Sequence, residues 1–167
     1  LSIATDNTKA LSLTNGSSIF VRTSFRSTTL QRLHISEMGK IANKYPEKAK
    51  ETKTGTLQAI APGNTAVIES TAEGDNLFKE MWDNAVTYYG ELSAKDFLPV
   101  FLSWVDDPDC VEKRTQIITD KQAKYFLEVE KELGFELTQE QKNFWVMQHR
   151  ELGDTIYQEY PTTPIEA

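Results

Sequence analysis

The sequence predicts an α/β domain with a mostly parallel sheet flanked by helices, to which a small helical subdomain is appended. Short apolar runs alternate with amphipathic helical stretches over residues 1–107, a pattern typical of parallel α/β sheets. From residue 108 the strand-like runs stop, and helix-capping signals followed by helical spacing take their place. The length of 167 residues fits about one domain, and 39% hydrophobic residues are enough for a core.

Each element of the α/β part is predicted from a local signal. Asn15-Gly16 is a strong turn dipeptide between two strand-like runs, and Pro46 is well placed at a helix start. Asp75 can cap a helix with one apolar face, and a loop is expected after Lys40. The expected elements are a hairpin over 11–23, strands over 30–35, 66–68 and 97–104, and helices over 47–53 and 76–89.

The last third of the chain is predicted to be helical and acidic. Two capping boxes of the form Thr-x-x-Gln, at 119–122 and 138–141, each precede a helical pattern. Gly134 is placed to end the first of these helices. The Pro-Thr-Thr-Pro stretch at 161–164 predicts an extended exit segment, because each proline disfavours helix in the residue before it.

Charge is distributed unevenly along the chain. The 18 Lys and Arg against 25 Asp and Glu give a net charge of −7. Residues 1–60 hold nine basic and four acidic residues, whereas residues 61–167 hold nine and 21, so the two parts carry +5 and −12. A nucleic-acid surface is therefore not expected to spread over the whole molecule.

Several classes of protein are excluded. Cys110 is the single cysteine, and His34 and His149 have no partner at zinc-ligand spacing, so neither an internal disulfide nor a zinc motif is expected. No apolar run approaches the roughly 18 residues that cross a bilayer, and the first residues lack a secretory signal pattern. We therefore expect a cytoplasmic protein without a membrane partner.

Polar residues follow two of the predicted strands. Ser36-Glu37 follows the strand over 30–35, and Glu69-Ser70-Thr71 follows the strand over 66–68. Ligands of doubly wound sheets bind at the carboxyl ends of strands, where a Glu can activate water and a hydroxyl can help to hold Mg²⁺ during nucleotide hydrolysis. The alternatives are a solvated strand end for Glu37 and helix capping for the hydroxyls.

Three arginines are candidates for binding phosphate. Arg26 lies between the hairpin and the strand that precedes Glu37, where a loop arginine can reach the phosphates of a neighbouring subunit. Arg22 and Arg32 compete with it, and a plain surface charge is the alternative for each.

Four segments, in order, carry a family resemblance. They are LHISEMGKIA, AVIESTAEGDNLFKEMW, FLPVFLSW and YQEYPTTPIEA. Together they resemble the large terminase subunit of tailed bacteriophages and prophages, the ATP-driven motor that packages viral DNA into a procapsid. The resemblance implies a P-loop NTPase-like core, and it covers essentially the whole chain.

The resemblance assigns roles to the candidate residues. Ser36-Glu37 matches the Walker B acidic pair, so Glu37 is the expected catalytic carboxylate. Ser70-Thr71-Ala72 matches the coupling motif that links hydrolysis to movement of the DNA-gripping surface. Arg26 matches the arginine that many family members use in trans. The helical part after Pro108 corresponds to the lid subdomain.

Two departures from the family pattern limit these roles. Most members have Asp where this chain has Ser36, whose hydroxyl can contact Mg²⁺ or its water shell without a formal charge. No phosphate-binding loop is present, because Gly39-Lys40 is followed by Ile41 rather than by Ser or Thr. We therefore expect the middle part of an ATPase domain, with an incomplete core over 1–107 and a lid and exit segment over 108–167.

The resemblance also implies cofactors and partners. Mg²⁺ and ATP are expected in the intact parent, which also has a nuclease domain, and neither is expected to bind tightly to this chain alone. Double-stranded DNA, the portal protein, the small terminase subunit and a homo-oligomeric ring are the expected partners, at the procapsid portal in the host cytoplasm. Two alternatives stay open: a helicase-like ATPase that translocates nucleic acid, and a non-enzymatic α/β interaction module.

Overall fold

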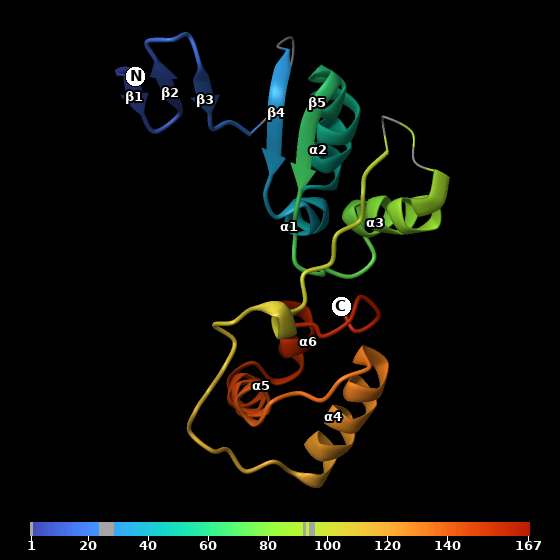
Figure 1. Cartoon of the computed structure of the whole chain (residues 1–167). Helices are drawn as coiled ribbons and strands as arrows, with labels where there is room; N and C mark the ends of the chain where they lie inside the picture. The colour runs from blue at the N-terminus through green and yellow to red at the C-terminus, as the bar shows by residue number, and fades with distance from the viewer. Residues whose placement is uncertain (1, 24–28, 92, 94–95) are drawn as a thin grey trace. The chain divides into compact units, whose positions relative to one another are not determined.

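The computed structural model describes residues 2–23, 29–91, 93 and 96–167 (Figure 1). The chain forms two compact units, Leu1–Glu69 and Ser70–Ala167. The first contains strands and short helices and the second is mainly helical, which confirms a mixed α/β chain. The boundary between the units, at residues 69 and 70, differs from the predicted functional boundary between residues 107 and 108. The predicted division into core and lid stays a prediction.

The first unit contains two small sheets and two short helices. An antiparallel sheet of order β1-β2-β3 comes first, and a parallel pair, β4-β5, follows. Between the parallel strands lie α1, α2, a π-helical turn and a 3₁₀ turn. The bounds are β1 Ile3–Asn7, β2 Ala10–Leu13, β3 Ser18–Phe20, β4 Leu30–Ile35, α1 Met38–Lys44, α2 Pro46–Glu51, the π turn Thr52–Thr56, the 3₁₀ turn Leu57–Ala59 and β5 Ile60–Ile68.

The predicted hairpin is confirmed. Strands β2 and β3 pair antiparallel, with Leu11 opposite Ile19, and Gly16 adopts a φ of 86° in the turn between them. The sequence did not predict β1, which pairs with β2 and is exposed along its whole length. Because its apolar and polar residues do not alternate over a long run, β1 carries no clear strand signal.

Strands β4 and β5 form the parallel pair that the sequence predicts over 30–35 and 66–68. Leu33 lies opposite Ala66 and Ile35 opposite Ile68. Strand β5 is longer than predicted, because it also includes residues 60–65. The register shifts between Ile60 and Thr65, and the Asn64 side chain donates to Leu30 O at 3.0 Å, so residues 61–64 form a bulge within the strand.

One predicted loop is wrong. The chain after Glu37 forms α1 instead, with Met38 fully buried and Ala42 5% exposed. The sequence contains little sign of this short helix, because it directly follows a strand and contains the Gly39-Lys40 pair. Its first residues are held by packing and not by a side-chain cap. The helix predicted from Pro46 is confirmed as α2, which packs against α1.

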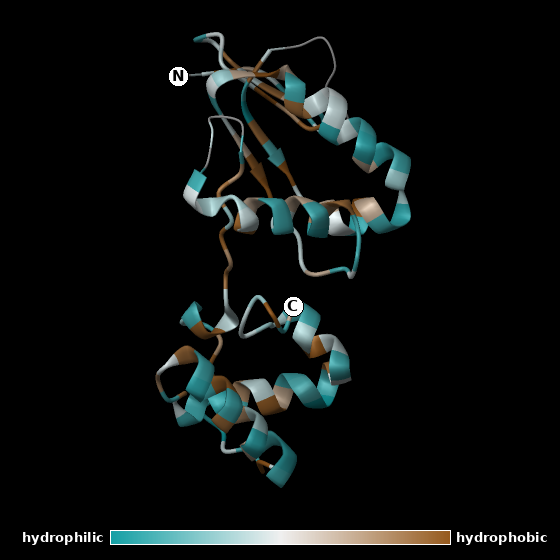
Figure 2. Ribbon diagram, turned by 90° about the vertical axis from the view of Figure 1, so that its right-hand side faces the viewer, coloured by the Kyte–Doolittle hydropathy of each residue, from teal (hydrophilic) through white to brown (hydrophobic). Residues whose placement is uncertain are grey.

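The second unit consists mainly of helices and turns. Its helices are α3 Leu77–Thr87, α4 Asp120–Leu133, α5 Gln139–Leu152 and α6 Ile156–Glu159, with 3₁₀ turns at Tyr89–Glu91, Trp104–Asp106 and Gly153–Thr155. Figure 2 shows apolar (brown) and hydrophilic (teal) residues interspersed along these helices. This is the composition expected of helices with one buried side.

Two details of the predicted elements are wrong. Asn76, not Asp75, caps α3, because its side chain accepts hydrogen bonds from the backbone N–H groups of Phe78 and Lys79. The run over 97–104 is not a strand: no described strand pairs with it, and Pro99 lacks a backbone donor. Apolar alternation alone does not provide the neighbouring strand that a ladder requires.

The core of the second unit is aromatic. Phe126 of α4 meets the Trp145 ring edge-on, with centroids 5.5 Å apart, and Trp145 also stacks on Tyr125 at 4.5 Å. Phe144 of α5 stacks on Trp104 at 5.7 Å. These rings join α4 and α5 to the 3₁₀ turn at Trp104, far away in the sequence.

Both capping boxes are confirmed. Thr119 and Thr138 each accept a hydrogen bond from the backbone N–H three residues on, and the glutamine at that position accepts one in return. Gly134 ends α4 with a φ of 78°, as predicted. Such reciprocal caps are local, which is why the sequence alone is sufficient to predict them.

The extended conformation predicted for residues 161–164 is wrong. Residues 161–166 form turns that dock onto the core, and Thr162 is only 2% exposed. Its Oγ1 accepts a hydrogen bond from Trp104 Nε1 at 3.0 Å and lies 2.9 Å from the Tyr125 hydroxyl, while its carbonyl accepts from Ser103 Oγ. Burial raises the pKa of the Tyr125 phenol well above its usual range. The partners of Thr162 lie far from it in the sequence, so no local sequence pattern predicts these contacts.

An amide anchors the loop before α4. Asn143 of α5 is 1% exposed, and its side chain donates to Glu112 O and accepts from the Gln116 N–H. The loop backbone is thus satisfied by a helix that follows it in the chain.

None of the helices in the described part of the chain has the length and apolar composition needed to cross a membrane.

An ion pair joins α5 to the end of α4. Lys142 Nζ lies 2.7 Å from Glu130 Oε1, which also accepts the Leu137 N–H at 2.8 Å, and the Glu130 side chain is 11% exposed. Burial opposes ionisation, but the hydrogen bonds from Lys142 and Leu137 and the Lys142 charge together hold the pKa of Glu130 below its ordinary value.

We predict that Glu130→Gln lowers the free energy of unfolding by about 1–3 kcal/mol at neutral pH. A lowered folded-state pKa stabilises the fold above the unfolded-state value of about 4.5, and this contribution disappears as pH falls through the folded-state value. Urea unfolding followed by circular dichroism should therefore show the difference between variant and wild type shrinking in acid.

Glu128→Gln is the matched control, because Glu128 pairs with Lys124 on the exposed face of α4. Exposed pairs contribute about 0–1 kcal/mol, so this variant should unfold almost as wild type does. An equal effect of the two substitutions, or a difference independent of pH, would contradict the role assigned to Glu130.

Candidate active site

Two parallel strands bring predicted residues to one edge of a sheet. The register pairs His34 with Val67 and Ile35 with Ile68, so β4 and β5 end side by side. Ser36-Glu37 follows β4, and Glu69 follows β5. Ser70-Thr71 comes next in the chain and opens the second unit.

The backbone of Glu69 holds the strand end in place. Its N–H donates to Ile35 O at 3.0 Å, and its carbonyl accepts the Met38 N–H at 3.1 Å. These two bonds lie on either side of Ser36-Glu37, so the dipeptide forms an arch between fixed points. The arch turns the chain from β4 directly into α1.

Glu37 has an unusual backbone conformation. Its φ of 59° and ψ of 42° are left-handed, and it is the only non-glycine residue with positive φ in the described ranges. This conformation costs a non-glycine residue about 1–2 kcal/mol. Such strain persists only where surrounding contacts impose it, and it is concentrated at functional sites. Here the buried Met38 and Gly39 impose it directly after the turn.

The Glu37 carboxylate is paired but accessible. Its Oε2 lies 3.1 Å from Lys40 Nζ, and the Glu37 side chain is 43% exposed. This Oε2 is shielded from solvent and, among the described residues, accepts no hydrogen bond in addition to the ion pair. The partly exposed pair is weakly held, so a bound ligand could replace Lys40 at little cost.

A second carboxylate lies at the end of the neighbouring strand. Glu69 Oε1 is 3.5 Å from His34 Nε2, an ion pair when the histidine is protonated. The His34 side chain is 64% exposed and the Glu69 side chain 48%. The edge therefore carries two carboxylates, each with a basic side chain beside it.

The hydroxyl residues differ in their surroundings. Ser36 is exposed at the arch, whereas Ser70 and Thr71 are half-buried. Thr71 Oγ1 is shielded from solvent and has no hydrogen-bond partner in the described part of the chain. A buried hydroxyl without a partner is costly, and a ligand or an ordered water would satisfy it.

Of the three candidate arginines, the two that the structure describes, Arg22 and Arg32, do not lie at this edge. Arg26 lies outside the described residues. Arg32 lies within β4, opposite Thr65, and is exposed. The Arg22 guanidinium lies 4.8 Å above the Phe20 ring in the antiparallel sheet. The role predicted for Arg26 stays a prediction.

The donors at the edge do not form a metal cage. No group of three or more His, Cys, Asp or Glu side chains suited to a metal ion occurs among residues 2–23, 29–91, 93 and 96–167. Mg²⁺ bound with a nucleotide takes most of its ligands from water and phosphate oxygens. A hydroxyl at Ser36 with a carboxylate at Glu37 fits that kind of site.

Two interactions at this edge were not predicted. Lys40 pairs with Glu37 across one turn of α1, a spacing that would have signalled the pair had the helix been predicted. Glu69 follows its strand as expected, but its backbone hydrogen bonds to Ile35 and Met38 were not predicted, because no side-chain pattern reveals them.

Comparison of the chain with protein-family models, curated proteins and solved structures gave no match. A functional assignment therefore depends on the residues and the geometry described above.

We predict that Glu37→Gly is more stable than Glu37→Ala by about 1 kcal/mol. Both changes remove the carboxylate and its ion pair, but only glycine adopts the left-handed conformation without strain. Thermal or urea unfolding of the two variants measures the difference directly. Equal stability, or a more stable alanine variant, would show that the arch relaxes and that Glu37 is not strained.

Proposed function

We propose that this chain is part of the ATPase motor of a large terminase subunit, which drives double-stranded DNA into a procapsid. The observation that supports it best is the parallel register of β4 and β5. That register puts Ser36-Glu37 after one strand, and leads the next strand through Glu69 into Ser70-Thr71. An acidic residue and a hydroxyl-rich segment after neighbouring parallel strands suit nucleotide hydrolysis.

In this proposal Glu37 is the catalytic base. Lys40 occupies one carboxylate oxygen, which leaves Oε1 to accept a proton from the attacking water. The strained arch would hold the carboxylate in one direction. Bound Mg²⁺ and ATP would supply the phosphoryl group and neutralise its charge. Ser36 would contact the metal or its water shell.

The segment after β5 would couple hydrolysis to movement. Ser70-Thr71 directly follows the residue whose backbone fixes the arch, so a change at Glu37 could reach it through Glu69. On the far side of the segment, the Glu73 side chain accepts a hydrogen bond from Gln158 at 2.9 Å. Residues 70–72 are thus flanked on one side by Glu69, with its backbone hydrogen bonds, and on the other by Glu73, with its bond from Gln158.

The charge distribution supports a role for the first unit in binding nucleic acid. Residues 1–69 carry nine basic and five acidic residues, whereas residues 70–167 carry nine and 20. We infer that DNA phosphates contact the first unit, with Arg26 available to a neighbouring subunit of a ring. The phosphate-binding loop would be supplied by another part of the parent polypeptide. The portal and the small subunit are the expected protein partners.

We predict that Glu37→Gln in the full-length subunit lowers the ATPase rate about 10²–10⁴-fold, because the amide cannot accept the proton of the attacking water. ATP turnover is measured with and without double-stranded DNA. Circular dichroism of the same variant should show a folded protein.

Glu47→Gln is the matched control. Glu47 and Lys50 form an exposed pair on α2 with the same three-residue spacing and the same 3.1 Å distance as Glu37 and Lys40. Removal of that pair should leave turnover unchanged. Wild-type turnover in the Glu37→Gln variant would refute the proposal, and DNA-stimulated turnover without any effect of portal or small subunit would favour a helicase-like translocase.

A further inference from the structure

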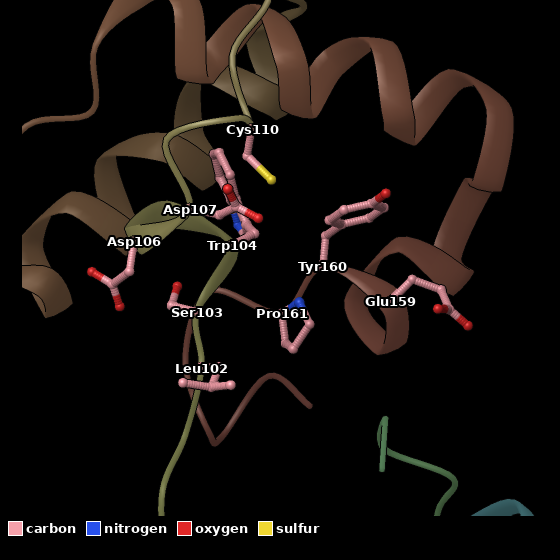
Figure 3. A pocket seen from close by; sticks show the side chains of 9 residues that line it. All are labelled: Leu102, Ser103, Trp104, Asp106, Asp107, Cys110, Glu159, Tyr160 and Pro161. Atoms are coloured by element: carbon pink, nitrogen blue, oxygen red, sulfur yellow. The ribbon is translucent and has the colours of Figure 1, made fainter. Parts of the chain in front are cut away.

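The second unit contains a cavity far in the sequence from the Glu37 arch. Its volume is about 370 Å³, and it lies between the 3₁₀ turn at Trp104 and the end of α6 (Figure 3). Aromatic, thiol and acidic side chains line it: Trp104, Asp106, Asp107, Cys110, Glu159 and Tyr160. None of these side chains has a part in the hydrolysis proposed above.

Two walls of the cavity are rigid aromatic rings. Trp104 is 4% exposed, stacks on Phe144 and donates its Nε1–H to Thr162 Oγ1 at 3.0 Å. The Tyr160 ring packs edge-on against the same Phe144, with centroids 5.4 Å apart. The ring edges and faces are therefore fixed before any ligand arrives.

Three carboxylates surround the aromatic walls. Asp106, Asp107 and Glu159 are exposed, and none of them lies within ion-pair distance of a described Lys, Arg or His side chain. Asp106 and Glu159 lie on opposite sides of the cavity in Figure 3, and Asp107 lies near its centre. Asp107 Oδ1 accepts the Asp109 N–H at 2.9 Å, which fixes this carboxylate beside Trp104.

The cavity has a negative potential. Burial, and then the charges of Asp107 and Asp109, raise the pKa of the Cys110 thiol, so the thiol stays neutral. The whole unit carries nine basic and 20 acidic residues. An anion is therefore disfavoured here, and a cation is favoured.

The chemistry of the walls identifies the cation. The described His, Cys, Asp and Glu side chains include no group of three or more that could hold a metal ion, and Asp106 and Glu159 lie on opposite sides of this cavity (Figure 3). A guanidinium is planar, stacks on aromatic faces and binds separate carboxylates, and its alkyl stem suits apolar walls. An arginine side chain matches all three features of this cavity.

We propose that this cavity receives an arginine side chain from a basic segment of a partner protein. The guanidinium lies against Tyr160 and pairs with Asp107, while Glu159 and Asp106 attract the flanking positive charge of the segment. The partner is thus a protein with an exposed arginine-rich stretch, and the negative charge around the cavity disfavours nucleic acid.

The test uses the complete 167-residue chain and the peptide acetyl-Arg-Arg-Arg-amide. Binding is followed by the indole N–H signal of Trp104 in ¹H–¹⁵N spectra and by calorimetry. We expect saturable binding with a shift of the Trp104 signal, and no such shift with the neutral citrulline peptide of the same length. Asp107→Asn with Glu159→Gln should weaken binding by about tenfold or more.

The matched control is Glu132→Gln with Glu136→Gln, which removes the same charge from exposed positions at the end of α4 and just beyond it. It should change the affinity by less than about threefold, because the lost contacts are only long-range. Equal weakening by the two double variants, a trilysine peptide that binds as tightly as triarginine, or a Trp104 signal that does not move, would each overturn the proposal.

Discussion

The arrangement of the candidate active site depends on two backbone hydrogen bonds of one residue. Glu69 joins its N–H to Ile35 and its carbonyl to Met38, and these bonds span the Ser36-Glu37 arch. Without them β4 could continue straight, and Glu37 could relax to an ordinary negative φ. The cost of the left-handed conformation, about 1–2 kcal/mol, is therefore offset by a parallel pair and by a helix that begins at once.

How much of the fold could be predicted depends on how far apart in the sequence the interacting residues of each element lie. Both capping boxes and the end of α4 at Gly134 were predictable, because each is a contact between residues a few positions apart. The docking of Thr162 and the anchoring of the loop by Asn143 were not, because their partners lie far away in the sequence. The run over 97–104 has a strand's composition, but a strand also needs a neighbour, and composition does not show one.

The candidate site shows the same division. The polar residues after β4 and β5 could be predicted from apolar runs that end abruptly, and the parallel register confirms that these strands are neighbours. The left-handed φ of Glu37 and its pair with Lys40 could not, because a helix start without a side-chain cap has little signal in the sequence. The acidic cavity went unnoticed because its walls come from segments some 50 residues apart, around Trp104 and Tyr160.

The contacts of Thr162 also bear on how the second unit responds to damage. The chain between the 3₁₀ turn at Trp104 and α4 is a long, largely exposed loop, the kind of segment that proteases cleave first. Ser103 and Trp104, before this loop, hydrogen-bond to Thr162, beyond it, and the Gln141 side chain donates to Val105 O at 3.0 Å. A single nick in the loop would thus leave two pieces that remain associated, and the unit could be expressed as two complementing fragments.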